Sequence, residues 1–150
     1  MTELKFKKNV DELNKHIKKL NQKFFYLKNV YEIPLKANYI ESIIEDESDD
    51  TLDVVAYRFS KLQDTLGRSI RLWIYLKGEN IENLTMIDIL NLANRFGINI
   101  DTQKWFDLRS LRNSISHEYE DNYEKIADTL NQIYAYLDEL NNIIKVLSEA

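Results

Sequence analysis

The chain has 150 residues and a mass of 17.9 kDa, which fits a single domain over residues 1–150 with one hydrophobic core. Its formal net charge of -5 argues against a general nucleic-acid coat protein, because nonspecific binding depends on neutralising phosphates. The lack of cysteine excludes disulfides, thiolate chemistry and cysteine-based zinc sites. No apolar segment has the length of a signal peptide or transmembrane helix, so we expect a cytoplasmic protein without a membrane partner.

The first third of the chain predicts two helices. From Phe6 to Tyr31 apolar residues recur at steps of three and four, which is typical of a long amphipathic helix that ends near Pro34. Its lysines make residues 1–28 locally basic; we interpret them as a solvated face, with an RNA-guiding surface as the alternative. A shorter helix is expected over residues 35–44. The acidic run 45–50 that follows is expected to stay in solvent.

The third predicted helix covers about residues 51–77. Gly67 interrupts it, either to let another helix approach closely or as a tolerated defect. Its predicted core-facing residues are Leu52, Val55, Phe59, Leu62, Leu66, Ile70, Trp73 and Ile74.

Three further helices complete the prediction. A turn is expected at residues 78–80, and Thr85 with Asp88 resembles a capping box for a helix that stops at Gly97. Asp101 is expected to cap the fifth helix, and after the polar residues 120–122 a last helix runs to the end. The predicted fold class is therefore all-α, an antiparallel bundle of five to six helices.

The fifth helix carries the residues with the most distinctive chemistry. The stretch 111–119, Leu-Arg-Asn-Ser-Ile-Ser-His-Glu-Tyr, combines a permanent cation with a histidine that exchanges protons near neutral pH. At 100° per residue, an apolar stripe faces the core and Arg112 lies at its edge. Arg112 either pairs structurally with Asp107 or Glu118 or grips phosphate. The stripe consists of Trp105, Leu108, Leu111, Ile115 and Tyr119.

The spacing Arg-x-x-x-x-His-x-Tyr, with Asn after the Arg, resembles the signature of the HEPN superfamily, particularly the HepT-like toxins paired with minimal nucleotidyltransferases. The sequence 57–63, Tyr-Arg-Phe-Ser-Lys-Leu-Gln, is also similar to the corresponding helix of that group. The resemblance is clearest over residues 50–149. It implies a HEPN-like bundle and a homodimer in which Phe106, Asn113 and His117 lie on the shared face.

The resemblance also implies a function. The chain would be the toxin of a type VII-like toxin-antitoxin pair, a metal-independent endoribonuclease acting on tRNA or mRNA, with Arg112, Asn113 and His117 as catalytic residues. Tyr119 would receive AMP from the cognate nucleotidyltransferase, and this AMPylation would neutralise the toxin. Arg58, Lys61 and Arg109 would contact the RNA backbone.

Two other functions stay open. One is a noncatalytic subunit that binds a nucleotidyltransferase, and the other is a helical structural protein in which the motif is coincidental. The residues predict neither a metal nor a cofactor, because two distant histidines without cysteine make a poor metal site and no glycine-rich phosphate loop is present. Taken alone, His117 and His16 are each more typical of structural or surface histidines than of catalysts.

Overall fold

Six α-helices make up the part of the chain that the computed structural model describes, residues 1–117 and 122–150 without the side chains of 113–117. No strand occurs among these residues, so the all-α prediction is confirmed. The helices are α1 (Thr2–Val30), α2 (Ala37–Glu45), α3 (Thr51–Leu76), α4 (Met86–Arg95), α5 (Thr102–His117) and α6 (Tyr123–Ser148).

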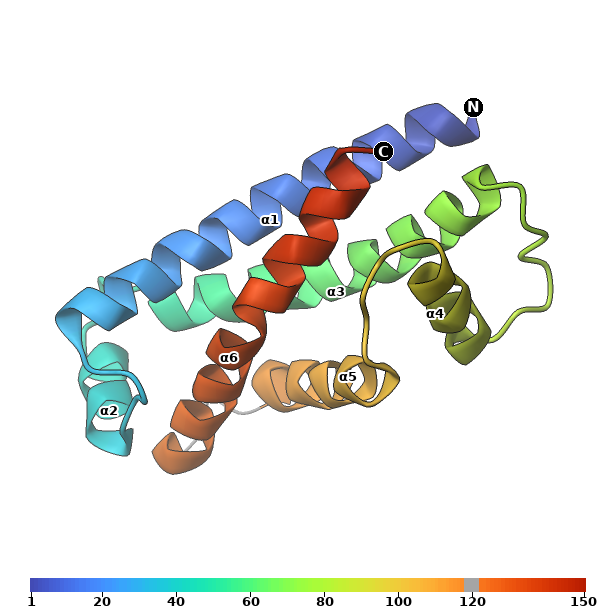
Figure 1. The fold of residues 1–150 in the computed structure, drawn as a ribbon. Helices are drawn as coiled ribbons and strands as arrows, with labels where there is room; N and C mark the ends of the chain where they lie inside the picture. The colour runs from blue at the N-terminus through green and yellow to red at the C-terminus, as the bar shows by residue number, and fades with distance from the viewer. Residues whose placement is uncertain (118–121) are drawn as a thin grey trace.

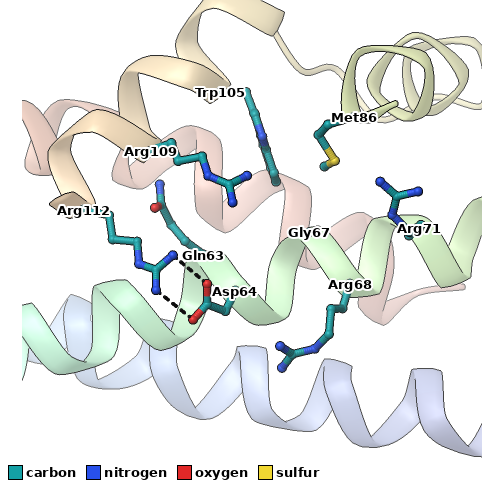
Figure 2. A pocket seen from close by; sticks show the side chains of 9 residues that line it. All are labelled: Gln63, Asp64, Gly67, Arg68, Arg71, Met86, Trp105, Arg109 and Arg112. Atoms are coloured by element: carbon teal, nitrogen blue, oxygen red, sulfur yellow. Dashed lines mark hydrogen bonds and ion pairs between the residues drawn. The ribbon is translucent and has the colours of Figure 1, made fainter. Parts of the chain in front are cut away.

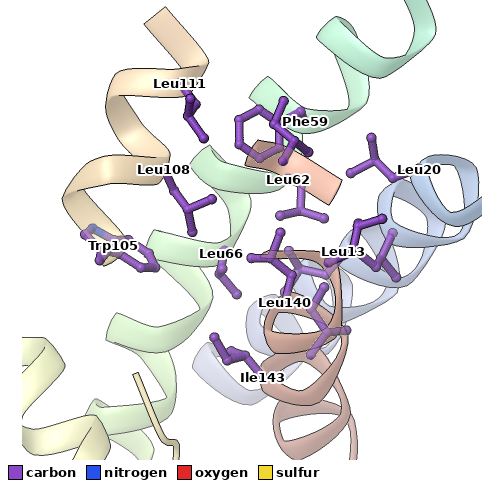
Figure 3. Packing of buried hydrophobic residues seen from close by; sticks show 14 of the residues in the cluster. Leu13, Leu20, Phe59, Leu62, Leu66, Trp105, Leu108, Leu111, Leu140 and Ile143 are labelled. Atoms are coloured by element: carbon purple, nitrogen blue, oxygen red, sulfur yellow. The ribbon is translucent and has the colours of Figure 1, made fainter. Parts of the chain in front are cut away.

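The long helices α1 and α3 run antiparallel to each other, and α6 crosses them (Figure 1). Helix α3 is central, because it contacts α1, α4, α5 and α6. Figure 3 shows how residues of α3 such as Phe59 and Leu66 meet leucines of α5 on one side and residues of α1 and α6 on the other. Every residue of α3 predicted to face the core is buried. Periodicity alone therefore identified this surface correctly.

The helix ends follow the expected capping chemistry. Thr85 and Asp88 form the predicted capping box, with the Asp88 amide donating to Thr85 Oγ1 at 3.2 Å and the Thr85 amide donating to Asp88 Oδ2 at 3.0 Å. Gly97 follows α4 with a φ of 104°, the left-handed conformation that favours glycine after a helix. Asp101 caps α5 by accepting from the Lys104 amide at 3.2 Å. These three predictions are confirmed.

The start of the second helix was predicted too early. Leu35 lies before α2, where its amide donates to Asn131 Oδ1 at 2.7 Å and its carbonyl accepts from Asn131 Nδ2 at 3.1 Å. This pair of bonds ties the backbone of Leu35 to α6 while its side chain is buried. The bonds replace helical ones, and such a long-range partner leaves no local signal in the sequence.

The acidic run after α2 is largely exposed, as predicted, and Asp50 forms an ion pair with Lys23 of α1 at 2.9 Å.

Within the described ranges, no helix combines the length and apolarity needed to cross a bilayer.

Candidate functional site

An open pocket of about 280 Å³ lies where α3 meets α5 and the start of α4 (Figure 2). Four guanidinium groups line it, and Asp64 is the acidic residue of its lining. A surplus of positive charge is therefore concentrated here, in a chain whose formal net charge is -5. A concave surface of this kind attracts anions. The four arginines are Arg68, Arg71, Arg109 and Arg112.

Helical spacing explains why these side chains converge. Asp64, Arg68 and Arg71 follow one another at steps of four and three along α3, so they share one face. On α5, Trp105, Leu108 and Leu111 are buried and hold the helix against the core. Arg109 and Arg112 lie beside that buried stripe, four and seven residues after Trp105, and Figure 2 shows both reaching from α5 toward α3.

Arg112 forms a bidentate ion pair with Asp64, drawn as dashed lines in Figure 2. Arg112 Nη1 lies 2.8 Å from Asp64 Oδ1, and Arg112 Nη2 donates to Oδ2 at 3.1 Å. The two side chains keep 30% and 37% of their exposure, so solvent screening limits the pair to about 0–1 kcal/mol of stability. The fork geometry thus orients the guanidinium more than it stabilises the fold.

The structural interpretation of Arg112, an ion pair with an acidic side chain, is confirmed, but with a carboxylate that the sequence did not indicate. The sequence pointed to Asp107 or Glu118, whereas the bidentate partner is Asp64, 48 positions away on α3. Asp107 Oδ1 instead accepts from Gln103 Nε2 at 3.0 Å, and Glu118 lies outside the described residues. The prediction considered only neighbours along the same helix, whereas the packing of α5 on α3 supplies a carboxylate from another helix.

The other arginines of the pocket are held to different degrees. Arg71 Nη1 donates to the Leu84 carbonyl at 3.2 Å, and Arg68 Nη2 lies 3.4 Å from Thr65 Oγ1. Arg109 is exposed and forms no hydrogen bond or ion pair within the described part of the chain. It is therefore the arginine of this pocket whose donors remain available to a ligand.

Gly67 forms the floor of the pocket. An ideal Cβ placed on it would lie 3.7 Å from Trp105 Cζ2 and 3.9 Å from Met86 Cε, which are ordinary contact distances. Neither the backbone nor the packing therefore requires a glycine here, although glycine inside a helix costs about 0.5–1 kcal/mol relative to alanine. The close-approach interpretation of Gly67 is not supported, since a methyl group would fit.

Arg58 and Lys61 lie in a neighbouring groove of about 350 Å³ between α1 and α3. Both cations are placed over the ring of Tyr57, at 5.7 and 5.8 Å from its centre. The groove shares Asp64 and Arg68 with the arginine pocket, so the two hollows adjoin along α3. Basic side chains thus recur along this part of α3 from Arg58 to Arg71, with Asp64 among them.

His16 of α1 belongs to this groove, and nothing in the sequence indicated its partner. Arg58 Nη1 lies 3.2 Å from His16 Nδ1. Because a guanidinium only donates, Nδ1 accepts the bond and the ring proton sits on Nε2. Burial, and then the charge of Arg58, lower the pKa of His16 below its usual value. His16 thus fits the interpretation as a structural histidine, through a contact that only the pairing of α1 with α3 creates.

This lowered pKa predicts a dependence of stability on pH. The unfolded chain takes up a proton on His16 near its ordinary pKa of 6.5, whereas the folded protein resists it, so the free energy of unfolding should fall as pH drops from about 7 to 5. In His16→Gln, whose amide oxygen still accepts from Arg58, this part of the fall should be absent. Urea unfolding of both proteins across that range measures the difference; parallel pH profiles would contradict the expectation.

The structure describes only part of the other motif residues, Asn113, His117 and Tyr119. The backbone of α5 continues through Asn113 and His117, but their side chains are outside the described residues, and Tyr119 lies outside them altogether. Whether His117 approaches Arg112 therefore stays a prediction. Among the described residues, no group of three histidine or acidic side chains is arranged to hold a metal ion.

Comparison with protein families, with curated proteins and with solved structures finds no match to this chain. The HEPN resemblance accordingly remains an expectation based on the residues quoted for it.

Proposed function

We propose that this chain is a metal-independent endoribonuclease toxin of the HEPN type, neutralised by a cognate minimal nucleotidyltransferase. The observation that carries the proposal is the arginine pocket, which gathers Arg109 and Arg112 with two arginines of α3 on an otherwise acidic protein. Phosphodiester chemistry needs such donors, because charge builds up on the phosphate oxygens in the transition state.

The proposed reaction is transesterification within the RNA strand. His117 takes the proton of a 2′-hydroxyl, whose oxygen attacks the adjacent phosphorus while the bond to the 5′-oxygen breaks. The leaving 5′-oxygen receives a proton from a second histidine, and a cyclic phosphate and a 5′-hydroxyl remain. Arg112, oriented by Asp64, stabilises the charge on the phosphate, and Asn113 orients the substrate or the histidine.

One observation favours the noncatalytic alternative, a subunit that binds a nucleotidyltransferase without cleaving RNA. The guanidinium of Arg112 already has a carboxylate in bidentate contact, and this neutralises part of its charge. In the ribonuclease, phosphate competes with Asp64 for the same donors. The ion pair is partly exposed, so its exchange for a phosphate is energetically small.

The test is incubation of purified protein with total RNA or tRNA in EDTA, followed by analysis of the fragment ends. We expect fragments with cyclic phosphate and 5′-hydroxyl ends. Intact RNA in the presence of a protein that binds the nucleotidyltransferase tightly would contradict the ribonuclease and favour the noncatalytic subunit.

The proposal also requires a homodimer that brings two His117 residues to one cleft. Phe106 of α5 keeps 37% of its exposure, on the face expected to carry Asn113 and His117. We expect light scattering at micromolar concentration to give a dimer for the wild type and a monomer for Phe106→Glu, because a buried carboxylate without a partner disfavours the interface. Phe25→Glu, at an aromatic side chain with 71% exposure on α1, is the matched control and should stay dimeric. A monomeric wild type would exclude this arrangement.

A further inference from the structure

We propose that the arginine pocket contains a base-binding subsite, in which one unpaired nucleobase of a single-stranded RNA sits on Gly67 between Trp105 and Met86. This inference rests on the proposed function, since it names the form of RNA that the same site takes. It goes beyond that function, because contacts to phosphate alone would bind a strand with bases and an abasic strand equally well.

The first argument is the apolar corner of the pocket. Trp105 reaches from α5 to Gly67, and Met86 faces it from the first turn of α4 (Figure 2). The edge of the indole ring and the methyl group of Met86 both lie within 4 Å of the place where a side chain on residue 67 would begin. The missing side chain therefore leaves an apolar slot with an aromatic wall and a thioether wall, both of which suit a flat aromatic ring.

The second argument is the glycine itself. A methyl group would fit at residue 67 and would favour the helix, so neither packing nor backbone conformation explains the glycine. A larger side chain, however, would extend into the pocket. Glycine at this position thus leaves the slot open. A ligand can then enter the slot.

The third argument is the polar surroundings of the slot. Trp105 Nε1 and Gln63 Oε1 are buried without a hydrogen-bond partner within the described part of the chain, and Trp105 is only 8% exposed. One is a donor and the other an acceptor, and both belong to residues that line this pocket. Buried polar groups are rarely left unpaired, so a small rotation of these two side chains toward the pocket would let them pair with a ligand edge that offers both an acceptor and a donor, as every nucleobase does.

The arginines identify the ligand as a nucleotide unit rather than an uncharged ring. Arg71 and Arg109 flank the slot from α3 and α5, and Arg109 keeps its donors available. A guanidinium plane stacks on a base and also binds the neighbouring phosphate. The ring must be unpaired to enter the slot, so the substrate is single-stranded at this position.

The experiment compares two oligomers with the same phosphates. One is a short single-stranded deoxyadenosine oligomer, which lacks the attacking 2′-hydroxyl and cannot be cleaved; the other is its fully abasic counterpart. Fluorescence anisotropy at low salt measures both affinities for the wild type, Gly67→Ala and Gly67→Leu. Both substitutions place better helix formers in α3, so loss of helix is not expected, and circular dichroism checks the fold.

We expect the wild type to bind the oligomer with bases about tenfold more tightly than the abasic one, because each stacked base contributes on that order. Gly67→Ala, whose methyl group would contact both walls of the slot, should keep only part of this preference. Gly67→Leu fills the slot and should bind both oligomers equally. Equal binding of both oligomers by the wild type, or a base preference that survives in Gly67→Leu, would overturn the subsite.

A second variant keeps the test decisive if Gly67→Leu does not fold. Met86→Ala removes the opposite wall at a partly exposed residue and should lower the base preference about threefold or more. An unchanged preference in Met86→Ala would place the base elsewhere. The expected base preference without any RNA cleavage in EDTA would leave the subsite standing and overturn only the ribonuclease. RNA cleavage without a base preference would support the ribonuclease and overturn the base-binding subsite.

Discussion

His117→Ala and Arg112→Ala are each expected to lower the rate of RNA cleavage at least about 100-fold while leaving the helical content unchanged. A general acid or base contributes about 10²–10⁴-fold, and a donor that stabilises transition-state charge contributes about 10²–10³-fold. The ion pair of Arg112 with Asp64 is partly exposed, so its loss should reduce stability by no more than about 1 kcal/mol.

The measurement is the initial rate of cleavage of a defined RNA in EDTA, with circular dichroism and thermal unfolding of each variant. Arg95→Ala is the matched control, because Arg95 is an exposed arginine of α4 outside the pocket lining. It should cleave at the wild-type rate. Undiminished cleavage by His117→Ala would remove the histidine from the mechanism, and the same result for Arg112→Ala would leave the arginine with a structural role.

Tyr119→Phe is expected to abolish the transfer of AMP from the cognate nucleotidyltransferase and, with it, the silencing of the toxin. The phenol oxygen is the acceptor in this proposal, and phenylalanine keeps the ring but lacks that oxygen. The added phosphate would carry negative charge that competes with RNA for guanidinium groups and repels the RNA backbone.

Intact-mass analysis after incubation with the partner and ATP measures this transfer. Tyr123→Phe is the matched control, because Tyr123 lies only four positions further along, at the start of α6, and should not be needed. Equal AMP addition to wild type and Tyr119→Phe would place the acceptor elsewhere. Tight complex formation without any AMP addition would instead favour neutralisation by binding alone.

The sequence by itself determined the secondary structure and the core. Apolar side chains at steps of three and four identified the buried faces of α1 and α3, because burial on a helix must follow its 3.6-residue repeat. Thr85, Gly97 and Asp101 marked helix ends correctly, since capping depends on residues only a few positions apart. These are local constraints, and local constraints can be read from neighbours in the chain.

Only the tertiary structure decided which side chains meet. The pairing of Arg112 with Asp64, of Arg58 with His16 and of Leu35 with Asn131 joins residues on different helices. Arg68 and Arg71 drew no attention in the sequence, and they become part of a site only because α5 packs its apolar stripe on α3 beside them. The angle and register of that packing depend on how all the core side chains interdigitate, and this information is spread over the whole chain rather than held in any motif.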